Sequence, residues 1–478
     1  MAALAAVALV LAAVAAAQSG GGGHAATARV TVDTGAPGRA VPPSFLGLSM
    51  EWTSVAPFGG PGRDGIVALL RRVEAAGRAP LPLRLGGASG EESWWNPGHR
   101  RMRPRTIRHD IDPATLAALA SLAGGLDAPV TMGVNLQLGD VRNALALARA
   151  ARRRLGPRLA GLEIGNEPDL YTSARTVGPV AVRRLRKRVR YTPADYVRDA
   201  GRYLDALAAG LPAPRPRLIV GGFAGKPGWA EALPRLIAAH RGAVGGVAAH
   251  RYAFAGCSLH PDAADLRGRL LSDAPRARMD ALAPLIRLAH ARGLPLRVAE
   301  LNSAPCGGAP GVSDSFAATL WLTDALFELV RIGADGADVQ TWDGAVYAPF
   351  ARRGRAVSAR PPFYGMLAFA RAAPRGTRLV PVHLRGGARV RAWATTDPAG
   401  TVRVALLAAT RARRVPVRLA VAAGRPCATV RVTSAPSLAA RAGVVDRPAQ
   451  RQCPRAGTLL LALPGPSVTV VTLPARGG

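Results

Sequence analysis

Two glutamates stand where apolar runs end, and their residue type and setting suit acid–base and nucleophilic chemistry. Glu167 closes the segment Gly161–Pro168, where Asn166 precedes it and Pro168, which cannot continue a strand ladder, follows. Glu300 closes a second apolar run that begins at Leu296. If both carboxyl groups face one pocket, the protonated one can donate to a glycosidic oxygen while the ionised one attacks the anomeric carbon. This pair predicts glycoside hydrolysis.

In that chemistry Glu167 is the expected acid/base and Glu300 the expected nucleophile. Asn166 is expected to hydrogen-bond the 2-hydroxyl group of the sugar, a contact that strengthens in the transition state. A separation of roughly 5 Å between the carboxyl groups gives retention of configuration, and one of roughly 6.5–9.5 Å gives inversion. The alternative interpretation is that both glutamates are solvated residues at strand ends.

Eight short apolar runs alternate with amphipathic segments between Ser44 and about Phe350. Eight strands with crossover connections predict a parallel (β/α)8 TIM barrel over residues 41–354, in which the two glutamates end strands four and seven. A doubly wound open sheet is the alternative, although no glycine-rich phosphate loop supports it. The expected strands are Phe45–Met50, Pro82–Gly86, Val130–Asn135, Leu159–Gly165, Leu218–Gly222, Gly246–His250, Leu296–Leu301 and Gly336–Trp342.

Helical spacing of apolar residues marks several connections between these runs. The expected helices are Gly65–Ala76, Val141–Arg154, Pro193–Ala209, Ala277–Arg292 and Ser313–Ile332. Because both glutamates then end barrel strands, their side chains are expected at the carboxyl-terminal face, where barrel active sites lie.

The pattern changes to alternating strand-like runs in residues 355–478, which predicts an antiparallel β-sandwich after a last helix at Phe363–Ala372. An early run within residues 28–40, Ala28–Asp33, is expected to cross over and join it. The other runs are Val380–Leu384, Ala388–Thr395, Val402–Ala408, Val415–Ala420, Thr429–Thr433, Gly457–Leu463 and Ser467–Leu473.

Other candidate substrate-binding residues lie at strand ends or in the loops after them. His250 and Tyr252 end the sixth strand, and either could hydrogen-bond the nucleophile and keep it ionised. Trp342 ends the eighth strand and could form the floor beneath the apolar face of a sugar. Trp95, next to Trp94, could wall the subsite. A structural histidine and tryptophans that only pack the core or the loop are the alternatives.

The formal net charge of this 478-residue chain is +33, and only Lys187 and Lys226 among its 63 basic residues are lysines. The arginines are scattered, which is typical of a composition bias from a GC-rich genome and does not favour a nucleic-acid partner. A positive field that attracts an acidic saccharide is the functional alternative. One dense basic run, Arg183–Arg190, could guide such a substrate or be a solvated loop.

The N-terminal run Met1–Gln18 is apolar and ends in small residues, as a signal peptide or an N-terminal anchor does, although no basic residue precedes Arg29. Residues 19–27 form an expected flexible linker. No later segment is long and apolar enough to cross a bilayer, so we expect a secreted protein, or one anchored at the cell surface.

Four cysteines in an exported chain favour disulfides. Their positions predict the pairs Cys257–Cys306 and Cys427–Cys453. The first would join the loops after neighbouring barrel strands. No short Cys or His spacing suggests zinc, and the predicted chemistry needs neither a metal nor an organic cofactor.

Several segments resemble glycoside hydrolase family 79, the β-glucuronidase and heparanase family, within the large clan of (β/α)8 retaining glycosidases. The Asn166–Glu167–Pro168 motif is shared with the clan. Three other segments carry the narrower resemblance: Phe45–Trp52, Leu83–Gly87, and Ala299–Ser303 followed by Cys306–Gly308.

The resemblance implies cleavage of β-linked glucuronic acid, with Arg84 of the second strand among the substrate-binding residues. One departure puts the exact sugar in doubt, because Ala88 stands where the family commonly has Asn after Gly86-Gly87. Hydrolysis of a neutral β-glycoside (a xyloside, arabinofuranoside or glucoside) and a non-catalytic polyanion-binding protein are the alternative functions.

Overall fold

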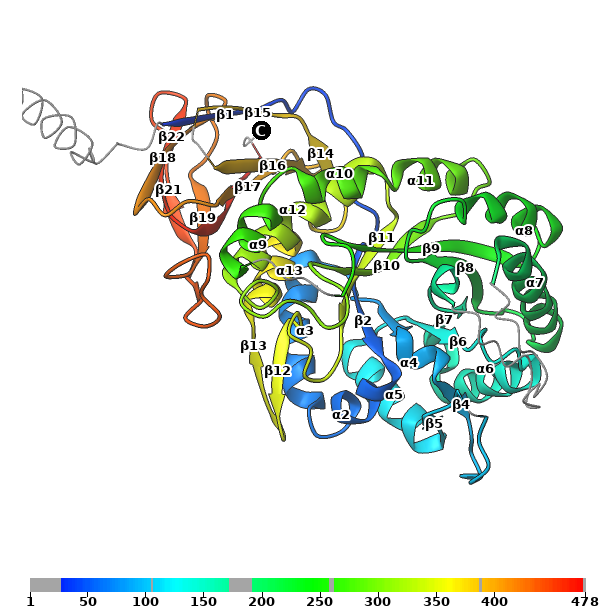
Figure 1. The fold of residues 1–478 in the computed structure, drawn as a ribbon. Coiled ribbons are helices and arrows are strands. Elements are labelled where there is room, and N and C mark those ends of the chain that lie inside the picture. Colours follow the sequence, from blue (N-terminus) through cyan, green and yellow to red (C-terminus); the bar gives the residue numbers. More distant parts are fainter. Residues whose placement is uncertain (1–26, 105, 172–190, 258–261, 387–388, 476–478) are drawn as a thin grey trace, which may run out of the picture.

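A computed structural model describes residues 27–104, 106–171, 191–257, 262–386 and 389–475. Eight parallel strands close into a barrel in the order β10-β11-β2-β3-β6-β7-β8-β9, which confirms the predicted fold class (Figure 1). The barrel strands are β2 (Leu46–Glu51), β3 (Leu83–Gly86), β6 (Val130–Val134), β7 (Leu159–Ile164), β8 (Arg217–Phe223), β9 (Val244–Tyr252), β10 (Leu296–Asn302) and β11 (Gly336–Thr341).

Helices surround this barrel, and both faces of its strands are covered, which is why the strands read as nearly continuous apolar runs. All six residues of β2 and of β11 are buried. The helices are α2 (Val55–Gly59), α3 (Arg63–Gly77), α4 (Ala88–Glu91), α5 (Pro113–Leu126), α6 (Val141–Leu155), α7 (Pro193–Gly210), α8 (Leu233–Ala239), α9 (Ala263–Leu270), α10 (Ala274–Asp280), α11 (Ala283–His290), α12 (Phe316–Ile332) and α13 (Pro361–Ala372).

One predicted helix, Ala277–Arg292, is wrong in its continuity. The chain forms α10 and α11 instead, with Ala281 and Leu282 between them. Pro284 is the physical reason, because it has no N–H for the carbonyl group of Asp280 and its ring crowds the preceding turn.

Two sheets form the sandwich, at the upper left of Figure 1. One sheet has the order β15-β1-β18-β22, from β15 (Val382–Arg385), β1 (Ala28–Val32), β18 (Arg414–Ala420) and β22 (Thr458–Pro464). The other has the order β14-β16-β17-β23-β19-β20, with β21 also on β19; these are β14 (Arg378–Val380), β16 (Val390–Thr396), β17 (Val402–Ala408), β23 (Ser467–Leu473), β19 (Ala428–Ser434), β20 (Val445–Asp446) and β21 (Gln450–Gln452).

The sandwich differs from expectation in two details. The run Val380–Leu384 is not one strand: β14 and β15 belong to different sheets, and Pro381, which cannot donate to a ladder, lies between them. The early strand β1 lies between β15 and β18 but pairs with β18 in parallel, so that sheet is not wholly antiparallel.

Two small ladders lie outside the barrel and the sandwich. β4 (Ser93–Trp95) pairs with β5 (His109–Ile111), and β12 (Phe350–Arg353) pairs with β13 (Ala356–Ala359). The first follows β3 and the second follows β11, so both belong to connections on the carboxyl-terminal side of barrel strands.

The predicted disulfides Cys257–Cys306 and Cys427–Cys453 are both present. Within the described part of the chain, no helix combines the length and the hydropathy that spanning a membrane requires. The run Met1–Gln18, most of the linker at residues 19–27 and the basic run Arg183–Arg190 lie outside the described residues.

The barrel interior contains an ion pair beneath the end that carries the two glutamates. Arg297 donates to both carboxylate oxygens of Asp338, at 2.7 and 2.6 Å. Gly47 leaves room for this pair: a Cβ atom there would lie 1.9 Å from Asp338 Oδ1 and 2.6 Å from Arg297 Nη2. A residue without a side chain is therefore required at position 47 to accommodate the Arg297–Asp338 ion pair.

We expect Gly47→Ala to lower the free energy of unfolding by about 1–3 kcal/mol, since the added methyl group must displace a buried ion pair. Chemical denaturation followed by circular dichroism measures this change. Gly124→Ala is the matched control, because Gly124 lies in α5 and a methyl group added there would have no neighbouring atom within 4 Å. Helix propensity predicts a gain of roughly 0.5–1 kcal/mol there. Equal effects of the two substitutions would contradict the steric argument.

Candidate active site

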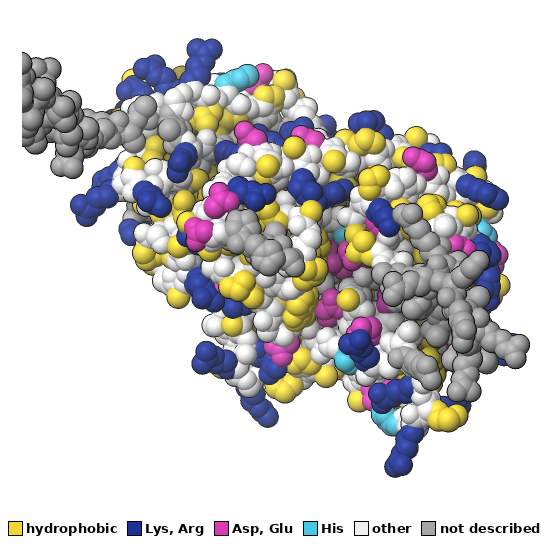
Figure 2. Space-filling model, viewed as in Figure 1, with side chains coloured by type: hydrophobic (Ala, Val, Ile, Leu, Met, Phe, Trp, Pro, Cys, Tyr) yellow, Lys and Arg dark blue, Asp and Glu magenta, His cyan; other side chains and the backbone are white. Residues whose placement is uncertain are grey.

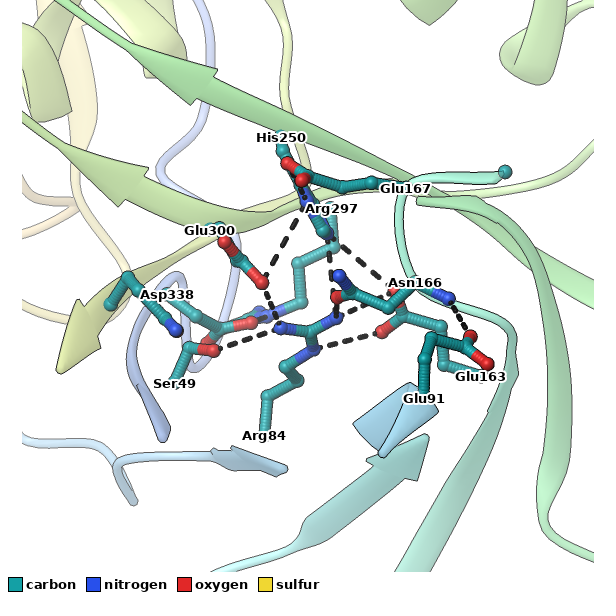
Figure 3. A network of polar contacts seen from close by, with 12 residues as sticks. Ser49, Arg84, Glu91, Glu163, Asn166, Glu167, His250, Arg297, Glu300 and Asp338 are labelled. Atoms are coloured by element: carbon teal, nitrogen blue, oxygen red, sulfur yellow. Dashed lines mark hydrogen bonds and ion pairs between the residues drawn. The ribbon is translucent and has the colours of Figure 1, made fainter. Parts of the chain in front are cut away.

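The guanidinium group of Arg84 lies at the centre of the polar network shown in Figure 3. Nε and Nη2 donate to the two carboxylate oxygens of Glu163, at 3.1 and 3.0 Å. Nη1 donates to Ser49 Oγ at 3.2 Å and to Glu300 Oε1 at 2.7 Å, and Nη2 also donates to Asn166 Oδ1 at 3.0 Å. These five contacts use all five N–H donors that a guanidinium group has.

This arrangement does not favour the expectation that Arg84 binds the substrate, which stays a prediction. Its side chain is 2% exposed, and no donor remains for a sugar. Arg84 instead joins β2, β3, β7 and β10, because its partners Ser49, Glu163 and Glu300 come from three other strands.

The carboxylate of Glu300 is held in its ionised form. Burial by itself would raise its pKa, but the charges of His250 and Arg84 and the hydrogen bond from Tyr252 outweigh burial and lower the pKa. Tyr252 Oη donates to Glu300 Oε2 at 2.7 Å. Of the two residues proposed to bond the nucleophile candidate, Tyr252 therefore makes the closer contact, since His250 Nδ1 is 3.7 Å from Glu300 Oε1.

The turn after β7 directs Glu167 toward Glu300. Glu167 has a φ of 46°, in the left-handed region, and its N–H donates to the carbonyl group of Gly222 at 2.9 Å. Its Oε1 lies 3.0 Å from His250 Nδ1. One oxygen each of Glu167 and Glu300 and a ring nitrogen of His250 all lie within 4.8 Å of one another. Glu167 remains 24% exposed, whereas Glu300 is buried, so the more open of the two carboxyl groups is that of Glu167.

His250 is fully buried between three carboxylates. Burial alone would lower its pKa, but Glu300, Glu163 and Glu167 raise it to about 10. The three carboxylates therefore favour the protonated ring, although Nε2 also lies 3.4 Å from Arg84 Nη2, whose charge acts in the opposite direction. A protonated imidazole has no lone pair for a metal, so the cluster of Glu167, His250 and Glu300 fits an ion-pair network better than a cation site.

Asn166 contacts Arg84 through its side-chain oxygen only. Its backbone N–H donates to Glu91 Oε1 at 2.6 Å, and its amide nitrogen makes no hydrogen bond with another described residue. Glu91 also accepts from Tyr171 Oη at 2.6 Å and from the N–H of Gln137 at 2.8 Å. Burial raises the pKa of Glu91 to about 7, although these hydrogen bonds act in the opposite direction.

A further carboxyl group, Glu51, ends β2 close to Glu300. It accepts from the backbone N–H of Ser89 at 2.8 Å and from the Ser89 hydroxyl group, and Gln340 Nε2 lies 3.3 Å from its other oxygen. Burial first and repulsion from Glu300 second raise the pKa of Glu51 to about 7. Glu51 is therefore only partly ionised at neutral pH.

Aromatic side chains gather beside Glu300. The ring centroid of Tyr347 lies 5.2 Å from that of Trp342 and 6.5 Å from that of Tyr252. The loop after β10 passes against Trp342, since a Cβ at Gly307 would lie 2.7 Å from Trp342 Cζ2. Tyr347 is fully buried, and its hydroxyl group interacts with Tyr252 without the geometry of a good hydrogen bond.

The two other predicted aromatic residues lie elsewhere. Trp95 is on β4, its backbone is bonded to Asn143 of α6, and its ring packs partly buried against the hydrophobic core. Trp94 Nε1 donates to Asp110 at 2.9 Å. The hydrogen bonds of these two residues therefore fix the β4–β5 ladder rather than join the network around Arg84.

The structure brings together Asn166, Glu167, His250, Tyr252 and Glu300. The sequence reasoning missed Glu163, Glu91, Glu51 and Tyr347. Glu163 could have been found from its place in β7: an acidic residue inside an otherwise apolar strand needs a buried cation. On the face shown in Figure 2, acidic side chains gather in the central hollow, over the ends of the barrel strands.

No model of a protein family matches this chain, and no curated protein sequence matches it. Solved structures with the same fold are glycoside hydrolases. A 4-O-α-L-rhamnosyl-β-D-glucuronidase from Fusarium oxysporum is 18% identical, with a TM-score of 0.75 over 93% of this chain and 100% of that one.

Two further structures extend this likeness. A family 51 arabinofuranosidase from Xanthomonas axonopodis is 17% identical, with a TM-score of 0.68 over 94% of this chain and 100% of that one. A family 30 xylanase from Clostridium acetobutylicum is 15% identical, with a TM-score of 0.58 over 94% and 100%. At these identities the likeness establishes a shared fold, which includes the sandwich as well as the barrel.

We expect Glu163→Gln to lower the free energy of unfolding by about 3–5 kcal/mol at neutral pH, because the buried Arg84 loses its bidentate partner. Arg84 and His250 outweigh the effect of burial and lower the pKa of Glu163 to about 2 from 4.5. Its stabilisation is thus fully present above pH 4.5 and is lost as the pH falls toward 2.

The difference in unfolding free energy between wild type and Glu163→Gln should therefore narrow as the pH is lowered from 5 toward 3. Urea titrations at several pH values measure it. Glu231→Gln is the control, since Glu231 is exposed, and a change within about 0.5 kcal/mol is expected there. A difference that stays constant with pH would show that the charge of Glu163 is not the cause.

Proposed function

We propose that this protein is a retaining glycoside hydrolase, with Glu167 as the acid/base and Glu300 as the nucleophile. The observation that carries the proposal is the approach of these two carboxyl groups from β7 and β10 to within 4.8 Å, with a protonated His250 beside both. Retaining enzymes place the pair about 5–5.5 Å apart, and inverting enzymes place it about 6.5–9.5 Å apart. The separation therefore supports double displacement.

Each neighbouring group has a part in that reaction. Arg84 and Tyr252 keep Glu300 ionised, so that one oxygen can attack the anomeric carbon while Glu167 protonates the leaving oxygen. Glu167, now ionised, then takes a proton from the water that cleaves the glycosyl ester. The free amide nitrogen of Asn166 can donate to the 2-hydroxyl group in both transition states.

For the substrate we propose a β-linked glucuronide, as the resemblance to family 79 implies. The structural likeness to a rhamnosyl-glucuronidase supports this choice. So does Tyr347, which lies beside Tyr252 and Trp342 and could turn its buried hydroxyl group from Tyr252 toward the sugar's carboxylate. Burial and the nearby Glu300 raise the pKa of Tyr347 well above 10, which keeps it a donor.

A neutral glycoside is the second candidate, because an α-L-arabinofuranosidase and a xylanase share the fold. Secretion belongs to the same proposal. Two disulfides fit an oxidising compartment, which is where an extracellular glycosidase would fold.

Incubation with a 2-deoxy-2-fluoro-β-glucuronide bearing a dinitrophenyl leaving group should label Glu300, because the fluorine slows both formation and breakdown of the glycosyl ester, while the activated leaving group speeds formation alone. Peptide mass spectrometry locates the label. Glu167→Gln should still be labelled, since this leaving group needs no protonation, whereas Glu300→Gln should not. A label on any other residue would overturn the assignment of roles.

Tyr347→Phe should raise the KM for a 4-nitrophenyl β-glucuronide by about 10-fold, the effect of losing one hydrogen bond to a charged group. The KM for the corresponding β-glucoside, which has no carboxylate, should change less than twofold. Steady-state kinetics with both substrates test this. If the two values rise together, Tyr347 shapes the pocket without recognising the carboxylate.

A further inference from the structure

Glu91 occupies a position that the double-displacement scheme does not use. It ends the short helix α4 after β3 and is 6% exposed. Its Oε1 accepts from Asn166 N–H and from Tyr171 Oη, both at 2.6 Å, and its Oε2 accepts from Gln137 N–H at 2.8 Å. One carboxyl group thus joins the loops after β3, β6 and β7.

The turn that Glu91 contacts, Gly165–Glu167, has an unfavourable backbone conformation. Gly165 and Glu167 both have positive φ, at 79° and 46°, and a left-handed conformation costs a non-glycine residue about 1–2 kcal/mol. The two N–H groups in this turn are fixed from opposite sides, that of Asn166 by Glu91 and that of Glu167 by the carbonyl group of Gly222. Without the first contact, the backbone of the turn would be fixed on one side only, although His250 would still contact the Glu167 carboxyl group.

The contacts of Glu91 are unusual for a buried carboxyl group. Its hydrogen bonds come from tyrosine and backbone groups, and no Arg, Lys or His among the described residues forms an ion pair with it. Glu163, equally buried in β7, has Arg84 as a bidentate partner. Because a buried carboxyl group without a cation costs stability, its retention beside the turn fits a role in positioning rather than in folding.

We propose that Glu91 is a positioning residue for acid/base catalysis: it fixes the Asn166–Glu167 turn so that the Glu167 carboxyl group meets the leaving oxygen. This inference rests on the proposed function. It concerns only the steps in which Glu167 transfers a proton, and it leaves attack by Glu300 unchanged, since Glu300 is held by Arg84 and Tyr252.

Leaving groups of different acidity separate this role from a general structural one. Dinitrophenolate leaves from a 2,4-dinitrophenyl glycoside without protonation, whereas phenol leaves from a phenyl glycoside only when the acid protonates the glycosidic oxygen. For both substrates, kcat/KM reports the first step. In Glu91→Ala no acceptor remains for the N–H groups of Asn166 and Gln137 or for the hydroxyl group of Tyr171, so the turn is released. We expect kcat/KM for the phenyl β-glucuronide to fall by roughly 10- to 100-fold, part of the 10²–10⁴ that general acid catalysis contributes. The value for the dinitrophenyl substrate should fall less than about threefold.

Tyr171→Phe provides a milder second variant, because it removes one hydrogen bond of Glu91 and retains the carboxyl group. In this variant kcat/KM should again fall more for the phenyl substrate than for the dinitrophenyl substrate, but both losses should be smaller. Glu74→Ala is the matched control: Glu74 is also buried and accepts the backbone N–H of Leu81, but it lies in α3, outside the network of Figure 3. The kcat/KM of this variant should equal that of the wild type for both substrates.

Equal losses for the two leaving groups in Glu91→Ala or in Tyr171→Phe, or no loss in either, would overturn the role of Glu91 while an active wild type still supports the hydrolase. A wild type that cleaves none of the phenyl and dinitrophenyl glucuronides and glucosides would instead overturn the proposed function, and the inference about Glu91 with it.

Discussion

The organisation of this barrel depends on one buried guanidinium group. A charge as deeply enclosed as that of Arg84 is stable only with full hydrogen bonding and a nearby opposite charge. Its five donors meet Ser49, Glu163, Asn166 and Glu300, so that β2, β7 and β10 are tied to β3 at fixed positions. The places of the two proposed catalytic carboxyl groups follow from that requirement, because one is itself a partner of Arg84 and the other is next to one in the chain.

The charges of the network also balance. With His250 protonated, Arg84 and His250 carry two positive charges, and Glu163 and Glu300 carry two negative charges when Glu167 holds its proton. In the proposed glycosyl intermediate Glu300 is a neutral ester and Glu167 is ionised, so these five groups again sum to zero. A low-dielectric pocket favours steps that conserve its net charge. The protonated His250 therefore suits both halves of the double displacement.

The sequence was sufficient to predict the strands that carry this site, but it was insufficient to predict the buried polar contacts between them. Apolar runs between helical segments located all eight barrel strands, and the residues ending those runs included Glu167, His250, Tyr252 and Glu300. The sequence did not reveal which polar residues are buried together: the family resemblance suggested that Arg84 binds substrate, and a lone arginine in a strand gives no sign of its partners. Those partners lie in strands far away in the chain.

The other misses have local causes. Pro284 and Pro381 break predicted elements that were otherwise placed correctly, and both breaks follow from the missing N–H of proline. Glu91 and Tyr347 come from connections between strands, where no hydrophobic period fixes the direction of a side chain. Charge composition was a poor guide for a related reason: on the face shown in Figure 2 the basic side chains are spread widely, while the hollow at the barrel mouth is acidic. If the substrate is the acidic sugar proposed above, neutral donors close to its carboxylate would suit such a hollow, because solvent and salt screen charges that are scattered over the surface.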